Sequence, residues 1–137
     1  MTNWSSRFVV LGVLGAFLFL TANASVYAHH SLAGVYAIGK EAKVTGAFKA
    51  FRLVNPHSVM KIDVKNKDGG LTEWTFIGGS VQQIARLGLK DGANALKPGD
   101  EITVTIVPAI DGKSPVGLLS AITYKDGHTV RFRSVDE

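Results

Sequence analysis

The side chains in this sequence best suited to metal chemistry are its four histidines, His29, His30, His57 and His128. Imidazole nitrogen is a good ligand for copper, zinc and nickel. The chain has no cysteine, which excludes a thiolate ligand, a cysteine nucleophile and a disulfide framework. No hydrolase elbow, phosphate loop or zinc-protease motif is present either. The sequence therefore predicts a metal site and no catalytic residues, and it favours a protein that is not an enzyme.

The first two histidines directly follow a predicted signal peptide. One charge, Arg7, precedes an apolar run of 13 residues from Phe8 to Leu20, which is the length of the hydrophobic region of a signal peptide and too short for a comfortable membrane span. Val26 and Ala28 are the small residues required before a cleavage site. We therefore predict that residues 1–28 are removed during export to the periplasm.

Cleavage after Ala28 would make His29 the first residue, with an α-amine and an imidazole that can bind one metal ion together. His57 could supply a third nitrogen, and His30 is an alternative ligand. Such a T-shaped, all-nitrogen arrangement is called a histidine brace. It suits Cu(II), with zinc, nickel or no metal as the alternatives.

Two other cleavage sites would change this prediction. Cleavage after Ala24 would start the chain at Ser25 and remove the amine ligand. Cleavage after Tyr27 would place His30 third, which is the spacing for copper binding by an amine and backbone amides, but tyrosine is a poor residue at that position.

The residues around His57 place it at the mouth of a predicted strand. Asn55-Pro56 interrupts the preceding β-rich stretch, because proline lacks a backbone donor and disfavours helix in the residue before it. The strand that follows, about residues 58–64, is apolar at every second position, and His57 falls on its other face. We expect His57 to be accessible, and His128, in a turn, to point to solvent.

Short strands separated by turns make up most of the remaining sequence. Their predicted ranges are 43–53, 58–64, 71–76, 102–106, 116–124 and 129–133. Ser80 and Gly88 bound a short helix, whose predicted inward positions are Val81, Ile84, Ala85 and Leu87. This order predicts a mainly β fold, a small OB-like Greek-key barrel of five to six strands with the helix between the third and fourth strands. A β-sandwich is the alternative, but it does not account for the helix.

Length and charge limit the other possibilities. Removing 28 of the 137 residues leaves 109, so we expect residues 29–137 to form a single OB-like domain. Arg7 is the only charge removed, which leaves 14 basic and 11 acidic residues and a net charge of +3. These charges are scattered, so nucleic-acid binding is not indicated. No second apolar run could span a bilayer, and we expect no stable membrane span after cleavage.

Three motifs give the chain a resemblance to a known family. They are Ala28-His29-His30-Ser31, Asn55-Pro56-His57 and Lys97-Pro98-Gly99-Asp100. In this order they resemble small exported bacterial proteins classed as a domain of unknown function with an N-terminal His-His-Ser motif. The resemblance covers essentially the whole mature chain and implies export and a small β domain, but no mechanism. Members often have Trp or Tyr shortly after Asn-Pro-His, where this chain has Ser58-Val59-Met60.

The sequence thus leads to two hypotheses of different classes. The first is a small periplasmic protein that handles copper through His29 and His57, with His30 as the alternative ligand. The second is a metal-independent OB-like module that binds a peptide, a glycan or an envelope protein. The oligomeric state does not follow from the sequence.

Overall fold

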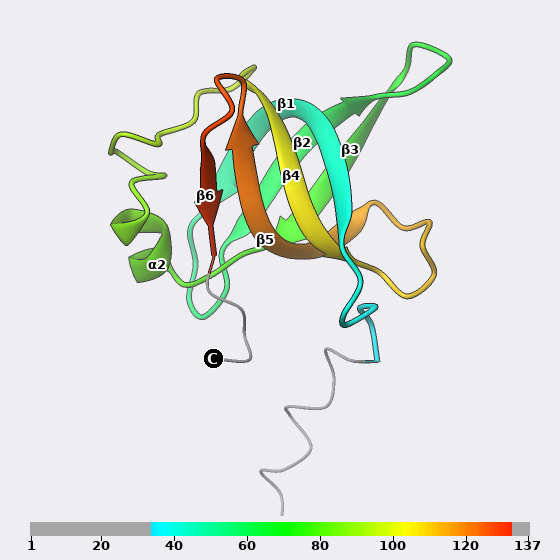
Figure 1. Ribbon diagram of the computed structural model, residues 1–137, viewed down its shortest axis with the longest axis horizontal. Helices are drawn as coiled ribbons and strands as arrows, with labels where there is room; N and C mark the ends of the chain where they lie inside the picture. Colours follow the sequence, from blue (N-terminus) through cyan, green and yellow to red (C-terminus); the bar gives the residue numbers. More distant parts are fainter. Residues whose placement is uncertain (1–33, 133–137) are drawn as a thin grey trace, which may run out of the picture. The chain divides into compact units, whose positions relative to one another are not determined.

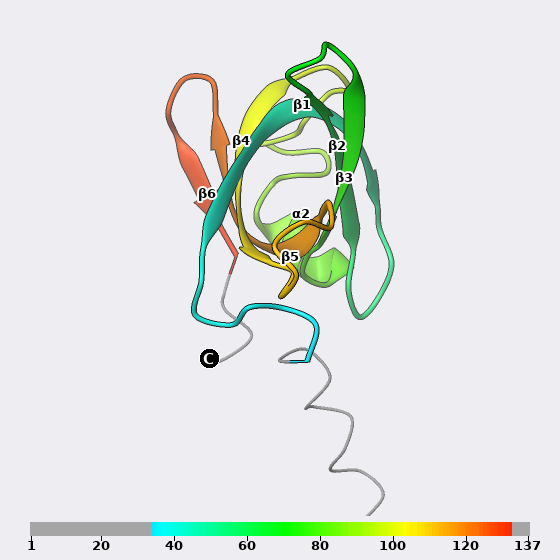
Figure 2. The same cartoon turned by 90° about the vertical axis from the view of Figure 1, so that its right-hand side faces the viewer.

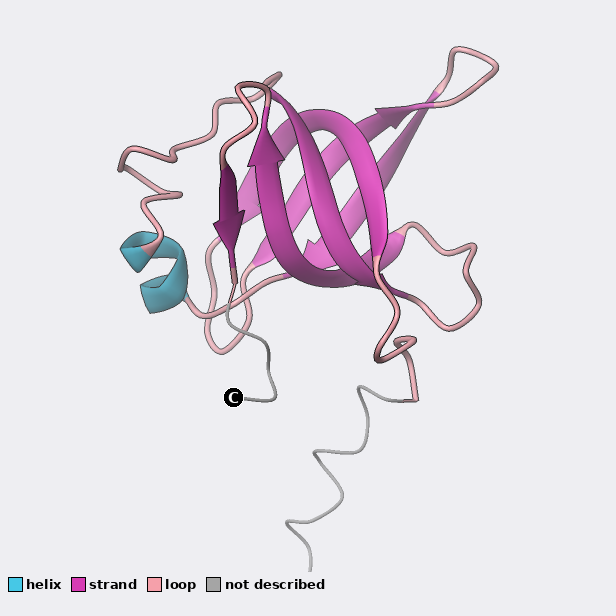
Figure 3. Cartoon of the chain, viewed as in Figure 1, coloured by secondary structure: helices cyan, strands magenta, loops and turns pink. Residues whose placement is uncertain are grey.

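Alternating apolar and polar residues form six strands in the part of the chain that the computed structural model describes, residues 34–132 (Figures 1 and 3). Their bounds are β1 Ala42–Arg52, β2 Val59–Lys65, β3 Leu71–Ile77, β4 Glu101–Pro108, β5 Val116–Tyr124 and β6 Thr129–Arg131. The helix α2, Val81–Arg86, lies between β3 and β4. The predicted strands are confirmed to within a few residues, although β6 is shorter than expected. The predicted boundary after Ala28 lies outside the described residues and stays a prediction.

Five of the strands close into a barrel. The order of hydrogen-bonded neighbours is β3-β2-β1-β4-β5-β6, and a further parallel pairing joins β3 to β5. That pairing matches Thr75 with Val116 and Ile77 with Leu118. β6 is an extra strand, antiparallel to β5. The view in Figure 2 shows the strands wrapping around a closed interior. This topology confirms the predicted OB-like barrel and excludes the β-sandwich.

The long strand β1 bends so that it can pair with two different neighbours. Its first half pairs with β4, its second half pairs with β2, and Ala47 has a partner on both sides. Gly46 lies at this bend, where a Cβ atom would come within 2.6 Å of the backbone oxygen of Asp63. Only glycine permits so close an approach of two strands.

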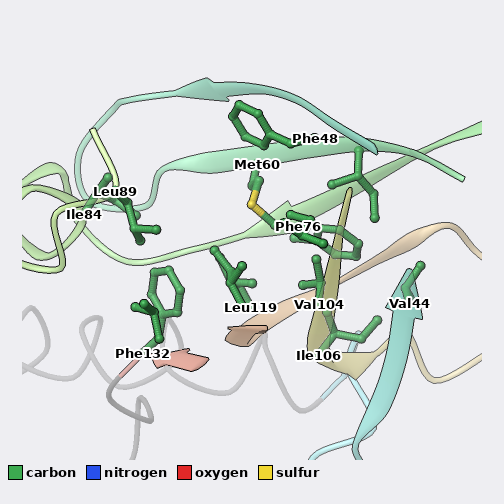
Figure 4. Close-up of a cluster of buried hydrophobic side chains, with 14 residues drawn as sticks. Val44, Phe48, Met60, Phe76, Ile84, Leu89, Val104, Ile106, Leu119 and Phe132 are labelled. Carbon is green, nitrogen blue, oxygen red and sulfur yellow. The ribbon is translucent and has the colours of Figure 1, made fainter. Parts of the chain in front are cut away.

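Inward-facing side chains from all six strands and the helix form one hydrophobic core (Figure 4). Met60, Ile62 and Phe76 are fully buried, as the alternation of β2 and β3 requires. The other members are Val44, Phe48, Ile84, Leu89, Ile102, Val104, Ile106, Leu119, Ile122, Val130 and Phe132. The core thus extends from the barrel interior to the segment around α2.

The helix α2 is short and is defined by its ends. The Ser80 Oγ accepts a hydrogen bond from the Gln83 N–H at 3.3 Å, and Gly88, two residues after the helix, adopts a φ of +68°. Ile84 is fully buried, whereas Ala85 is exposed, so the predicted inward position of Ala85 is wrong. Successive helical residues are about 100° apart, and a helix of six residues turns only one narrow face to the core. Within residues 34–132, no helix is long and apolar enough to cross a membrane.

The outer face of β1, β2 and β3 carries a small network of ion pairs. Lys49 lies 2.7 Å from Glu73 and 3.3 Å from Asp63, and Lys61 also pairs with Glu73. The hydrogen bonds from Lys49 and then Lys61 lower the pKa of Glu73 to about 2. Glu73 therefore connects lysines from two neighbouring strands.

Replacing Ile84 with alanine tests whether α2 is part of the core. We expect Ile84→Ala to lower the free energy of unfolding by about 2–5 kcal/mol, because it leaves a cavity among fully buried side chains. Gln82→Ala, on the exposed side of the same helix, should change it by less than about 0.5 kcal/mol. Urea unfolding measures both variants. Equal effects of the two would contradict the assigned burial.

Replacing Glu73 with glutamine should make the free energy of unfolding less dependent on pH in the acid range. A carboxyl whose pKa falls on folding stabilises the protein above its ordinary pKa of 4.5, and this stabilisation is lost as the pH falls toward about 2. The stability difference between wild type and Glu73→Gln should therefore be largest above about pH 4.5 and vanish near pH 2, as measured by urea unfolding across this range. Glu101→Gln, at an exposed position outside the network, is the control. A difference that is constant with pH would contradict the role of the lysine pairs.

Candidate functional site

His57 lies in the connection between β1 and β2, two residues before β2 begins. Its side chain is exposed, as expected, whereas Met60 and Ile62 on the following strand are fully buried. The peptide bond between Asn55 and Pro56 is cis. The exposed imidazole thus lies in a connection of six residues, with Asn55 on its N-terminal side and Ser58 on its C-terminal side.

On the N-terminal side of His57, Asn55 joins the connection to the helix. The Asn55 Oδ1 accepts a hydrogen bond from the backbone N–H of Val81 at 3.1 Å. Val81 is the first residue of α2, and its N–H has no acceptor within the helix. The side chain of Asn55 therefore caps a helix that lies 26 residues further along the chain.

On the C-terminal side, Ser58 joins the connection to the end of β3. Its N–H donates to the Gly79 oxygen at 2.8 Å, and its own carbonyl oxygen accepts from the Gly78 N–H at 2.7 Å. Ser58 is fully buried, and its hydroxyl donates to the Val54 oxygen at 3.4 Å. The ladder between β2 and β3 thus continues one residue beyond the strand, directly beside His57.

The chain enters the barrel at the same end as His57. The start of β2 pairs with the end of β3, and the end of β3 pairs with the start of β5. The start of β5 also pairs with the end of β4, so these four strand ends lie at one end of the barrel. The Ala37 N–H then donates to the oxygen of Pro108, the last residue of β4, at 2.9 Å. Figures 1 and 2 both show the connection after β1 and the residues before β1 at the lower end of the barrel.

His29 and His30 lie outside the described residues. The predicted cleavage after Ala28 and the predicted ligand set of His29, His30 and His57 therefore stay predictions. Within residues 34–132, no three side chains of His, Cys, Asp or Glu gather where they could hold one metal ion together.

His128 makes more contacts than the sequence predicts. We expect it to point to solvent, and its side chain is indeed 43% exposed, but its ring stacks on Tyr124 with centroids 4.1 Å apart. Its Nδ1 lies 2.6 Å from Asp126 Oδ1, and its Nε2 lies 3.2 Å from Asn94 Oδ1. Both ring nitrogens face protein acceptors, so this histidine is occupied by structural contacts.

The same contacts fasten the hairpin between β5 and β6 to the segment between α2 and β4. The Tyr124 hydroxyl donates to the backbone oxygen of Asn94 at 2.5 Å, and the Asn94 Nδ2 donates to the Leu87 oxygen at 2.7 Å. Burial, followed by the charges of Asp100 and Asp126, raises the pKa of Tyr124 to about 12. The phenol therefore stays protonated and remains a donor at any physiological pH.

Sequence reasoning singled out His57 but missed the polar residues that hold its neighbourhood. Asn55 and Ser58 flank His57 in sequence, and their types are common in turns. Their partners, Val81 and Gly79, are more than 20 residues away, and no local pattern indicates such a pairing. The Asp126-Gly127-His128 turn does contain a signal, since aspartate often accepts from the N–H two residues on, as it does here at 3.1 Å.

Comparison with known proteins identifies the family but no activity. No curated protein matches the chain. The model of a family of unknown function, DUF6152, matches residues 17–118, which include β1 to β4, α2 and the start of β5. The match covers well over half of the 137 residues, and the sequence positions of His29, His30 and His57 fall within it. The chain therefore belongs to the DUF6152 family of unknown function.

Proposed function

We propose that this protein is exported to the periplasm and binds one copper ion through His29 and His57. After cleavage behind Ala28, the α-amine and imidazole of His29 supply two nitrogens and His57 supplies the third. His30 is the alternative ligand from the N-terminal segment. Zinc is the alternative metal, because it accepts the same nitrogen donors with less demand on geometry.

The observation that carries this proposal is the position of His57. Its imidazole is exposed, while Asn55 and Ser58 on either side of it are hydrogen-bonded to α2 and to the residues after β3. A ligand held in this way loses little conformational freedom when it binds a metal ion. His128, the other described histidine, has both ring nitrogens against acceptors. Of these two histidines, His57 is therefore the better candidate for a metal ligand.

The N-terminal segment is the natural source of the remaining ligands. The described chain enters at the barrel end that carries His57, through the pairing of Ala37 with Pro108. His29 precedes Val35 by six residues, and a segment of this length extends to about 20 Å at most. The proposal requires this segment to reach the connection after β1.

The proposed ligands suit copper binding and delivery better than redox catalysis. An amine and imidazoles are the donors that tetragonal Cu(II) prefers. A copper ion held near an exposed connection is accessible for transfer to a partner.

Copper binding by the mature chain tests this function. We expect a chain that starts at His29 to bind one equivalent of Cu(II), with several nitrogen ligands visible by electron paramagnetic resonance. His57→Ala should weaken binding by more than about tenfold and remove one nitrogen, since loss even of an outer hydrogen-bond partner costs about 10–100-fold. His128→Ala is the matched histidine control and should bind as the wild type does.

The start of the chain supplies a second control. A chain that starts at Ser25 keeps all four histidines but moves the amine four residues away from His29, and it should bind copper more weakly. Unchanged affinity in His57→Ala would mean that the N-terminal segment binds copper by itself. If the chain that starts at His29 binds no metal, the metal-independent binding module becomes the better hypothesis.

A further inference from the structure

We propose that Asn55 is a positioning residue for His57, acting through its hydrogen bond to the first residue of α2. This inference rests on the proposed function, because it concerns how the metal-binding imidazole is held. Asn55 is not proposed as a metal ligand itself. Through its bond to Val81, the helix α2 takes part in forming the site.

Two side chains cap the start of α2. A helix begins with N–H groups that have no acceptor in the preceding turn. In α2 the N–H of Gln83 is satisfied by Ser80, the residue directly before the helix, whereas the N–H of Val81 is satisfied by Asn55. Each of the two side chains accepts a hydrogen bond from an N–H group at the start of the helix. Only Asn55, however, belongs to the connection that carries His57.

The helix α2 is itself anchored in the core. Ile84 of α2 is fully buried, and Leu89, just after the helix, is 2% exposed, so this segment is packed into the core. Because Val81 lies one turn before Ile84, its N–H is fixed relative to the barrel. The bond to Asn55 passes this fixed position on to the connection between β1 and β2.

The residues on the two sides of His57 are held to the fold in different ways. Ser58, on one side, is held by two backbone hydrogen bonds and by burial. Asn55, on the other side, is exposed, and the hydrogen bond of its side chain to Val81 links it to the fold. Removing that oxygen frees the N-terminal half of the connection while leaving Ser58 in place. The imidazole between them would then sample more orientations.

Three variants of the mature chain that starts at His29 separate positioning from capping. Asn55→Ala removes the acceptor, Asn55→Asp replaces the amide oxygen with a carboxylate oxygen at the same place, and Ser80→Ala removes the other cap of α2 without changing a residue of the connection. We expect Asn55→Ala to weaken Cu(II) binding by about 10–100-fold, as for other residues that orient a metal ligand. Asn55→Asp and Ser80→Ala should stay within about threefold of the wild type.

A metal-free readout keeps this test independent of the proposed function. In amide hydrogen exchange and in NMR of the His57 ring, Asn55→Ala should speed exchange at Val81 and broaden or shift the His57 signals. Ser80→Ala should speed exchange at Gln83 and leave the His57 signals unchanged. If the wild type binds no copper but these differences appear, the proposed function fails and the positioning role stands. If Asn55→Ala and Ser80→Ala affect His57 equally, or neither does, Asn55 is only a helix cap and the inference is overturned.

Discussion

The parallel contact between β3 and β5 is the constraint on which the rest of the structure depends. Without it the strands would form an open, curled sheet with two exposed edges. The contact brings the end of β3 against the start of β5, where Gly117 pairs with both Phe76 and Pro108. A Cβ atom at Gly117 would lie 2.7 Å from the end of the Ile106 side chain and 3.0 Å from the Val107 backbone oxygen, so glycine at this position lets β4 approach β5 closely. The end of β3, fixed in this way, is also where Ser58 finds its partners and where the chain turns into α2.

Much of this barrel follows from local sequence patterns. The range of β5 is predicted to the residue, because the flanking turns at Asp111-Gly112 and Asp126-Gly127 leave little freedom. Ser80 and Gly88 likewise identify the ends of the helix. The burial of its residues was less predictable, as exposed Ala85 shows, because a small apolar residue at the margin of a helix face can lie on either side. The closing contact of β3 with β5 is implied only by analogy with other barrels, since pairing between distant strands leaves no short-range pattern.

The candidate site likewise contains features that the sequence predicts and features that it does not. His57 could be found from its residue type and its place at a strand mouth, and its exposure from the two-residue period of β2. The Asn55–Val81 bond could not, because it depends on the fold bringing a strand connection to a helix end. His128 is exposed, as a turn residue next to glycine is expected to be. Its contacts were not predictable, because its Nε2 lies against Asn94 of a distant segment, its Nδ1 against Asp126, and its ring on Tyr124.

The central role of β5 also has a consequence for the order in which the fold can be assembled. β5 pairs with β3, β4 and β6, yet it begins only at Val116, after both β3 and β4. A chain that emerges from its N-terminus must therefore present the edges of β3 and β4 without this partner until β5 has followed them. Contacts of such long sequence separation form slowly, and unpaired edges invite association with other chains. The interval before β5 arrives is thus the period in which these strand edges are most open to pairing with other chains.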